Sequence, residues 1–312
     1  MQRSPELAFH ALRPSVTLRR RILKLGVASL AVVVADIVVL RALDLRPGSL
    51  RSQFRSDVQR FQRQVSAAGA PPLVTDADLA GLPPAIQTYL RRAQVVGKPR
   101  VRAFHAVFRA KFRATAWARW MDAEVEQRNY FGPGGPARLF YMRATRAGIP
   151  FVGYHRYVGA EATMRVRLAG LIDVVNASGE LMTQSETVTL FNDMCFLAPA
   201  ALLDAPVTWQ ALDQRRVRAT YTNAGKSIGA ILSFDEAGDL VGFVSEDRYQ
   251  SDGKGFRLLP WSTPLRNYRD FGVARLVSEG DARWIEPTGE WTYGHFVLQR
   301  ITYDEGNAGG QP

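Results

Sequence analysis

The stretch ETVTLFNDMCFLAPAALLD, from Glu186 to Asp204, predicts the one clear amphipathic helix in a region that otherwise has the pattern of β-strands. Thr183 and Glu186 have the T-x-x-E spacing of a capping box, which predicts that the helix begins there, and Pro199 ends or kinks it. Apolar side chains lie on both sides of a narrow polar stripe, which consists of Thr189, Asn192 and Asp193. A helix that is apolar around most of its girth must be enclosed by the rest of the fold. We therefore expect a buried helix held in a concave antiparallel sheet.

Two alternating stretches before this helix predict a β-hairpin. Residues 104–113 alternate apolar with mainly basic side chains, and residues 120–126 alternate apolar with mainly acidic ones. With a turn near residues 117–118, opposite charges face one another in three pairs, which are Arg113 with Asp122, Lys111 with Glu124, and Arg109 with Glu126. A slip of one residue would turn both apolar rows toward solvent. The sequence thus predicts both the hairpin and its register.

Further strand-like segments lie on both sides of the helix. They cover residues 139–144, 152–158, 164–168, 217–221, 228–234 and 240–245, and the last strands are rich in aromatic side chains. The acidic segment 235–239 lacks the spacing of a calcium loop and is interpreted as a hairpin turn. The predicted fold class is α+β and mainly antiparallel β, a curved sheet or open half-barrel around a buried helix, with an N-terminal transmembrane helix.

Residues 22–43 are the candidate membrane segment. The run reaches the length needed to span hydrocarbon if Lys24 and Arg41 extend to the two surfaces. The alternative is a cleaved signal peptide, but no A-x-A cleavage site and no lipobox cysteine follow the apolar core. Basic residues before the segment favour an N-terminus on the inner side. We therefore expect a single-pass protein of the inner (plasma) membrane with most of the chain extracytoplasmic.

This interpretation divides the chain into five parts. They are a cytoplasmic basic tail at 1–21, the anchor at 22–43, a helical stalk and linker at 44–81, the antiparallel β-rich domain at 82–305 and a disordered tail at 306–312. In the stalk, apolar residues recur at helical spacing from Leu50, and the intervening arginines either meet anionic headgroups or are simply solvated.

Composition restricts the functions that the chain can have. The formal net charge is +11, but the positive excess lies within the first 128 residues, at the anchor and stalk, so no nucleic-acid partner is predicted. The single cysteine, Cys195, excludes an internal disulfide. No paired histidine motif, Walker loop or G-x-S-x-G sequence is present, so we predict no metal site and no cofactor.

The candidate ligand-binding residues are the aromatic and apolar side chains of the helix and the later strands, with one arginine. They are Phe191, Met194, Phe196, Trp209, Arg248, Trp261, Tyr268, Trp284 and Tyr293. Such a set can line an apolar cavity for a membrane lipid or another apolar small molecule, or it can simply fill the core between sheet and helix.

Two other classes of function remain open. One is a hydrolase or isomerase that uses His155 or His295 with a carboxylate such as Asp247 or Glu290, which would require those groups to converge in a cleft. The other is a structural role in the cell envelope, with a protein partner in place of a small ligand.

A family resemblance is carried by scattered positions from about residue 82 to 305. They include Leu82-Pro-Pro with Tyr89-Leu90, Gly159, Met164, the helix ending in Pro199 with Leu202-Leu203, Trp209, Phe234-Asp235, Arg248, Pro260-Trp261, Tyr268, Trp284 and Ile301-Thr-Tyr303. On these positions the chain resembles a bacterial domain family without an assigned function. It departs from that pattern at His155, where the family tends to have Asp, and at Met194 to Phe196, which replace an acidic, tryptophan-bearing stretch. More remotely, strands interrupted by an apolar helix are similar to the half-barrel of LolA- and LolB-type lipoprotein and lipid carriers.

Overall fold

The computed structural model describes residues 46–132, 134–146, 148–251 and 255–303. The predicted basic tail, the anchor at 22–43 and the C-terminal tail lie outside these residues. Among the helices that are described, none combines the length and the apolar character needed to cross a membrane.

The fold is dominated by one antiparallel sheet of 13 strands in the order β6-β5-β4-β3-β2-β1-β15-β14-β13-β10-β9-β8-β7. Its first six strands are β1 (Ala103–Phe112), β2 (Met121–Tyr130), β3 (Ala137–Arg146), β4 (Ile149–Val158), β5 (Glu161–Leu168) and β6 (Ile172–Ser178). The others are β7 (Val207–Ala211), β8 (Arg216–Asn223), β9 (Lys226–Phe234), β10 (Leu240–Ser245), β13 (Trp261–Asp270), β14 (Arg275–Glu286) and β15 (Gly289–Tyr303). A separate pair is formed by β11 (Tyr249–Ser251) and β12 (Phe256–Leu258).

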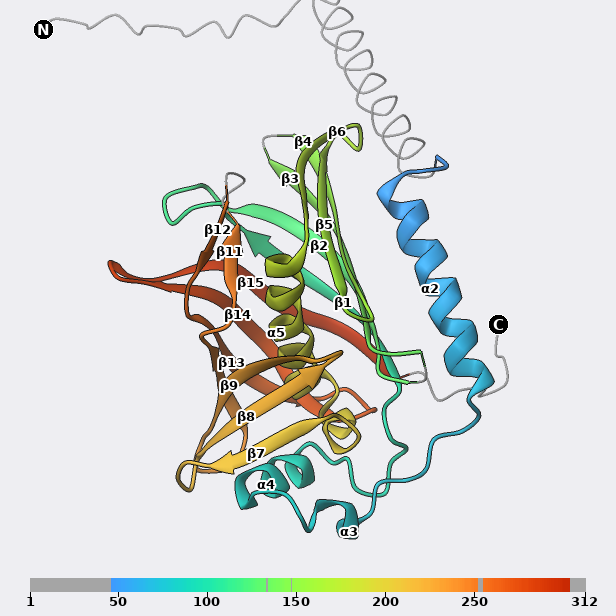
Figure 1. Ribbon diagram of the computed structural model, residues 1–312, viewed down its shortest axis with the longest axis vertical. Coiled ribbons are helices and arrows are strands. Elements are labelled where there is room, and N and C mark those ends of the chain that lie inside the picture. Colours follow the sequence, from blue (N-terminus) through green and yellow to red (C-terminus); the bar gives the residue numbers. More distant parts are fainter. Residues whose placement is uncertain (1–45, 133, 147, 252–254, 304–312) are drawn as a thin grey trace, which may run out of the picture.

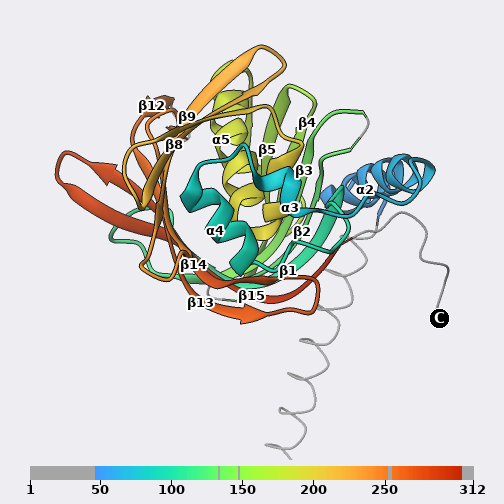
Figure 2. The ribbon, with the colours of Figure 1, turned by 90° about the horizontal axis from the view of Figure 1, so that it is seen from below.

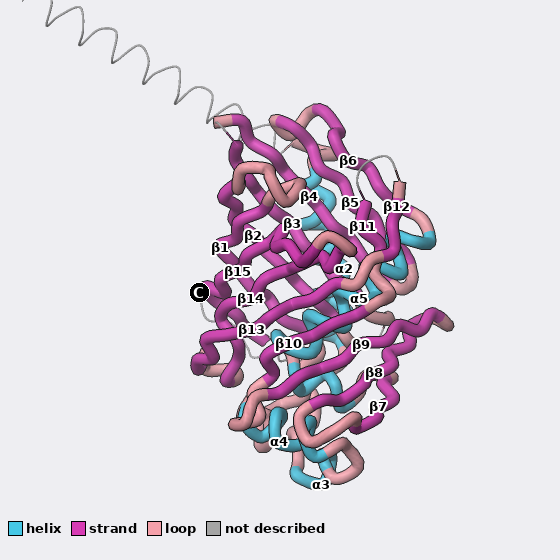
Figure 3. Tube along the Cα trace, turned by 90° about the vertical axis from the view of Figure 1, so that its left-hand side faces the viewer, coloured by secondary structure: helices cyan, strands magenta, loops and turns pink. Residues whose placement is uncertain are grey.

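The large sheet is strongly curved and not closed, with β6 and β7 at its edges, and it wraps around helix α5 (Glu180–Leu197) (Figures 1 and 3). All but four of the helix's 18 residues are buried. The predicted arrangement of a buried helix in a concave antiparallel sheet is therefore confirmed.

The start of α5 differs from the prediction. The helix begins at Glu180, six residues before Glu186, and the N-cap residue is Gly179, whose φ of 96° favours glycine. The Thr183 hydroxyl donates to the Gly179 carbonyl from within the first turn, at 3.0 Å. Glu186 does not cap the helix, because its carboxylate binds Arg138 in the interior. The predicted end is confirmed, since α5 stops before Pro199 and a 3-10 helix, η1 (Pro199–Leu203), follows.

The predicted β1–β2 hairpin forms, but its register was wrong by two residues. Lys111 lies opposite Asp122, and Arg109 opposite Glu124. The predicted partner of Asp122, Arg113, lies beyond the end of β1, where its Nε donates to the Thr292 carbonyl at 2.6 Å. The connecting loop covers residues 113–120, so Arg113 belongs to the loop and not to the strand as predicted. Because the shift is even, the apolar row of each strand still faces the core.

Helix α2 (Leu50–Ala67) packs against the outer face of β2, β3 and β4 (Figure 1). The helical pattern predicted from Leu50 onward is confirmed, and its buried side chains form a second core with Tyr141 and Tyr154. Asp57, which is partly buried at this contact, accepts hydrogen bonds from Tyr154 Oη at 2.8 Å and Arg156 Nε at 2.9 Å.

Two short helices, α3 (Asp76–Leu79) and α4 (Pro84–Arg92), cover one end of the concavity (Figure 2). Tyr89 Oη of α4 donates to the Cys195 carbonyl of α5 at 2.7 Å. Asp239, in the acidic turn before β10, accepts both Arg92 Nε at 2.7 Å and Arg275 Nη1 at 2.6 Å. Burial would raise the pKa of Asp239, but these two guanidinium groups hold it well below its usual range. Asp239 therefore connects α4 to β14 through ion pairs with Arg92 and Arg275.

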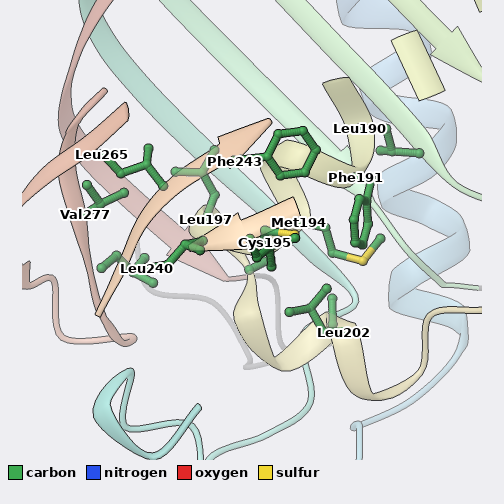
Figure 4. Packing of buried hydrophobic residues seen from close by; sticks show 14 of the residues in the cluster. Leu190, Phe191, Met194, Cys195, Leu197, Leu202, Leu240, Phe243, Leu265 and Val277 are labelled. Atoms are coloured by element: carbon green, nitrogen blue, oxygen red, sulfur yellow. The ribbon is translucent and has the colours of Figure 1, made fainter. Parts of the chain in front are cut away.

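The main core lies between α5 and the strands β8, β9 and β10 (Figure 4). Phe191 stacks on Tyr221 with ring centroids 5.1 Å apart and lies 5.9 Å from the ring of Phe243. On this side the helix and the sheet are in continuous apolar contact.

Candidate functional site

The opposite side of α5 lies against a cavity of about 330 Å³. Its walls are the concave faces of β1 to β5 and β13 to β15 together with one face of α5, and most of the lining is apolar. The apolar lining includes Phe108, Phe112, Phe140, Met142, Met164, Val166, Leu265, Val277, Phe296 and Leu298. The volume is at the lower end of the range for small-molecule sites, which are typically about 300–1,000 Å³ and mostly apolar.

Four phenylalanine rings form one wall of this cavity. Phe296 of β15 has ring contacts with Phe112 at 5.3 Å, with Phe108 at 6.0 Å and with Phe140 at 6.4 Å. Their edge-to-face geometry is the arrangement that aromatic pairs prefer. The wall is thus held in place by its own packing.

The α5 side of the cavity is mainly polar. It presents side chains that recur every three or four residues and therefore share one helix face, namely Glu186, Thr189, Asn192, Asp193 and Phe196. Asn192 Nδ2 donates to Thr263 Oγ1 at 2.7 Å, which ties the helix to β13. The stripe of Thr189, Asn192 and Asp193 in the sequence is thus the part of α5 that faces the cavity.

Arg138 of β3 is the centre of a buried ionic network. Its Nε donates to Asp193 Oδ2 at 2.6 Å, and its Nη1 donates to Glu186 Oε2 at 3.1 Å. Gln127 Nε2 and Asn129 Nδ2 also donate to Asp193, at 2.7 and 3.3 Å. Buried charges are tolerated where they are paired and hydrogen-bonded in this way.

The two carboxyl groups of this network differ in their electrostatics. Burial raises the pKa of Asp193 despite its bonds from Arg138 and the two amides. Burial opposes ionisation of Glu186 as well, but the positive field of Arg138, supported by Arg248, lowers the pKa of Glu186 overall. Glu186 is therefore the carboxylate of this pair that stays ionised most readily.

Arg248 lies at one end of the cavity, between two tryptophan rings. Its guanidinium carbon is 4.5 Å from the centroid of Trp261 and 5.1 Å from that of Trp284. Its Nη1 donates to Tyr293 Oη at 3.1 Å, and its Nε donates to Thr189 Oγ1 at 3.2 Å. Trp261 Nε1 donates to the same Tyr293 hydroxyl at 3.0 Å. The group is rigid because stacking and hydrogen bonds fix the guanidinium plane.

This end of the cavity continues into an open groove. Both are lined by Arg113, Ala114, His155, Met164, Glu186, Arg248 and Tyr293. Beyond them the groove is lined by Trp117, Val174, Tyr249, Trp284 and Trp291, among others. The cavity therefore has a mouth with polar groups at its rim and an apolar interior behind it.

The nine residues predicted to bind a ligand fall into three groups. Phe196, Arg248, Trp261 and Tyr293 line the cavity, and Trp284 lines the groove and stacks on Tyr293 with centroids 5.6 Å apart. Phe191, Met194, Trp209 and Tyr268 line neither. They belong to the packed core, where Trp209 lies 6.4 Å from the ring of Phe191 and Tyr268 Oη donates to the Leu240 carbonyl.

Sequence reasoning missed the Arg138 network and most of the apolar wall. Arg138 is the second residue of strand β3, where nothing in the sequence distinguishes it from a surface arginine. The usable signal was the polar stripe of α5. Polar side chains on a helix that must be enclosed have to find partners inside, and here those partners line the cavity.

The histidines predicted for an enzymatic alternative do not meet the carboxylates named with them. Asp247 Oδ2 accepts the Gly229 amide at 2.6 Å, and Glu290 Oε1 accepts the Ser262 hydroxyl at 2.9 Å. His295 pairs with a different carboxylate, Asp281, at 2.8 Å. Burial lowers the pKa of His155 to about 4. No cluster of three or more metal-ligating side chains occurs among the described residues.

Comparison with known proteins gives a family and weak structural similarities. Three solved structures are similar at 10–13% identity. A DUF1329 family protein from Desulfovibrio piger matches with a TM-score of 0.40 at 13% identity, covering 72% of this chain and 93% of that one. A domain from Vibrio parahaemolyticus, described as a candidate outer membrane lipoprotein-sorting protein, matches with a TM-score of 0.36 at 12% identity, covering 66% and 86%.

The third structure is a LolA superfamily protein from Nitrosomonas europaea, with a TM-score of 0.32 at 10% identity, covering 70% of this chain and 93% of that one. The predicted similarity to LolA-type proteins is thus found, at a level that leaves the function to be argued from the site. No curated protein matches the chain. The family model described as "Family of unknown function (DUF6544)" matches residues 72–296, and the chain belongs to this family.

Proposed function

We propose that this protein binds a lipid-like or other apolar ligand in the cavity beside α5. The observation that carries the proposal is an apolar space of about 330 Å³ whose mouth has the polar rim described above. Burying apolar surface there stabilises a bound chain by roughly 25 cal/mol per Å² removed from water. A hydrocarbon chain would contact the phenylalanine wall, and a polar end group would remain at the mouth beside Arg248 and Tyr293.

The ionic network favours a neutral apolar occupant for the interior. The charges of Asp193 and Glu186 are balanced by Arg138 and by Arg248, whose Nη2 lies 3.5 Å from Glu186 Oε1, and all four groups lie in the wall. An additional buried charge in the cavity would have no free partner among these groups, and unpaired buried charges cost several kcal/mol or more. The network therefore selects against ligands with a charge at their inner end.

The proposed setting is the cell envelope. Residues 22–43 would anchor the chain in the inner membrane, and the β-rich domain would lie on the extracytoplasmic side, where an envelope protein is a further candidate partner. The support is the apolar run itself and the basic residues before it.

The test is native mass spectrometry, with lipid extraction, of the full chain purified from its own host. We expect a bound mass that is lost when the cavity is filled by Met142→Trp or Met164→Trp, since both side chains line it. The matched control is Leu212→Trp, which places the same ring at an exposed position away from the cavity and should leave the bound mass unchanged.

Two results would overturn the proposal. One is a chain that carries no apolar ligand and takes up none from added fatty acid or phospholipid. The other is a bound mass that all three variants retain, because the ligand would then lie outside the cavity.

A further inference from the structure

Three loops lie at one end of the sheet. The strand register places Phe112 opposite Met121, so the 113–120 loop follows the end of this hairpin. Asp122 lies opposite Thr145, which puts the β3–β4 turn at the same end. Leu168 pairs with both Phe151 and Ile172, which adds the β5–β6 turn. With neighbouring strands about 4.8 Å apart, the three loops form a rim about 20 Å wide.

This rim is unusually apolar. The exposed large apolar side chains on it, with their exposed fractions, are Trp117 at 94%, Trp120 at 41%, Ile149 at 50%, Leu171 at 49%, Ile172 at 63% and Val174 at 49%. Single exposed apolar residues are ordinary, but a group of them on adjacent loops marks a contact surface. Trp117 and Val174 also line the groove that leads into the cavity. The cavity mouth and the apolar rim are therefore at the same end of the molecule.

The N-terminal start of α2 is at this end too (Figure 1). Arg46 Nη2 donates to the Gly170 carbonyl at 3.3 Å, and Arg167 Nη1 donates to the Gly48 carbonyl at 3.4 Å. Only residues 44 and 45 separate Arg46 from the proposed anchor at 22–43. Three residue steps span at most about 11 Å, so an anchored chain holds this end close to the bilayer surface.

The charges near the rim also fit a membrane surface. Arg119 on the 113–120 loop and Arg146 at the end of β3 are both exposed. The acidic groups there are already paired, Asp122 with Lys111 and Asp173 with Arg165 and Arg167. Tryptophan is enriched at the headgroup level, and basic residues are attracted to an anionic leaflet.

We propose that this rim sits in the surface of a phospholipid bilayer, with the cavity mouth facing the lipid. The inference rests on the proposed ligand-binding function and deepens it, because it names the bilayer as the source or acceptor of the ligand. An apolar chain could then pass between the bilayer and the cavity without crossing water.

The experiment uses the full chain in vesicles made of equal amounts of phosphatidylethanolamine and phosphatidylglycerol. Single cysteines that carry an environment-sensitive fluorophore are introduced by Ile172→Cys and Trp117→Cys on the rim. The native Cys195 is buried and should not react. The control is Leu73→Cys, which is also exposed but follows α2 and lies beyond the opposite end of β1. Quenching by nitroxide-labelled phospholipid and by aqueous iodide is measured at each site.

We expect the two rim probes to be quenched by the labelled phospholipid and protected from iodide, and the Leu73→Cys probe to behave in the opposite way. Iodide quenching of the rim probes equal to that of the control would overturn the bilayer contact and leave the rim as a surface for a protein partner. Ligand retention is measured on the same samples by mass spectrometry. Retention without bilayer contact rejects only the inference, whereas contact without any bound ligand rejects only the proposed function.

Discussion

The two faces of helix α5 are both buried but differ in how they pack against the sheet. One face carries Val188, Phe191 and Cys195, which are fully buried in the core that α5 forms with β8 to β10. The other carries Glu186 and Asp193 among the polar side chains that line the cavity. Burial therefore does not distinguish the structural face from the candidate binding face, since both are enclosed. The two faces differ in whether the surrounding side chains fill the space between helix and sheet.

On the cavity face the side chains do not fill this space, because hydrogen bonds to their partners hold the polar groups in place. Glu186 and Asp193 are directed at Arg138, and Thr189 accepts from Arg248, so none is free to fold over and fill the apolar space. Protein interiors are otherwise close-packed, so a void of this kind persists only where its walls are fixed. The ionic network thus maintains the cavity.

The largest expected effect tests that network. Arg138→Met leaves the buried Asp193 without its cation and Glu186 with only Arg248, 3.5 Å away, and breaking a buried pair by removing one partner typically costs about 3–5 kcal/mol. We expect the urea midpoint of the full chain to fall by the corresponding amount. The matched variant adds Glu186→Gln and Asp193→Asn to Arg138→Met, which removes the orphaned charges and should recover part of the loss. A loss below about 1 kcal/mol for the single change, as for an exposed ion pair, would show that the network is solvated.

The second prediction compares the two faces directly with the same substitution. Phe191→Ala opens a cavity in a packed core and should cost about 3–5 kcal/mol of unfolding free energy. Phe196→Ala enlarges a space that already exists, loses fewer contacts and should cost about 1 kcal/mol, close to its transfer term alone. Both values come from denaturant unfolding. Equal losses would contradict the difference between the faces.

How much of this could be predicted from the sequence differs between features. The enclosed helix and the antiparallel strands follow from periodicity, which reports burial over many residues. The β1–β2 register did not follow, because charge pairing on the outer face is worth only tenths of a kcal/mol and does not distinguish shifts of two residues. In the structure Arg113 lies in the loop and not in the strand, and its Nε donates to the Thr292 carbonyl instead of facing Asp122. The start predicted from Thr183 and Glu186 was also wrong, because the helix begins earlier, at Glu180, with Gly179 as its N-cap residue.

For the site, the sequence located the helix, and of the three α5 residues predicted to bind a ligand only Phe196 lines the cavity. Phe191 and Met194 were selected because they are apolar, and they are core residues. Asp193 and Asn192 line the cavity and were treated only as a polar stripe. Apolar character alone does not distinguish side chains that fill the core from side chains that line the cavity, because both kinds are shielded from water. The partners that decide the matter, such as Arg138, come from a strand 55 residues away from Asp193 in the chain.

The third prediction concerns pH and the cavity mouth. Burial, with Arg138 and Arg248 nearby, lowers the pKa of His155 to about 4 from 6.5, although Glu186 opposes the shift. The unfolded chain then binds more protons than the native chain between these values, so the free energy of unfolding falls as the pH falls. One pKa unit corresponds to about 1.4 kcal/mol, and the loss between pH 7 and pH 5 should be about 2 kcal/mol.

The measurement for His155 is urea unfolding from pH 7 to pH 4.5, for the native chain and for His155→Gln. The variant should show a flatter pH dependence over this range. Glu126 and Asp281, whose pKa values are lowered to about 2 from 4.5 and 3.8, affect the free energy of unfolding mainly at the acid end of this range, and they do so equally in both proteins. Parallel curves for the two proteins would mean that His155 is solvated, and the mouth would then be wetter than the structure indicates.

The smallest expected effect sharpens the comparison of the two faces by a reciprocal exchange. Thr189→Val removes the hydroxyl that accepts from Arg248 on the cavity face, and Val188→Thr adds one on the packed face. The side chains have nearly the same volume, so packing is preserved and polarity alone changes. Losing a hydrogen bond, or burying a hydroxyl among apolar atoms, costs about 1 kcal/mol in each case. Both variants should therefore lower the unfolding free energy although they exchange the same groups in opposite directions. If either variant left the free energy of unfolding unchanged, the two faces would not differ in polarity as the hydrogen bonds indicate. The cavity would then be a packing defect and not a binding site.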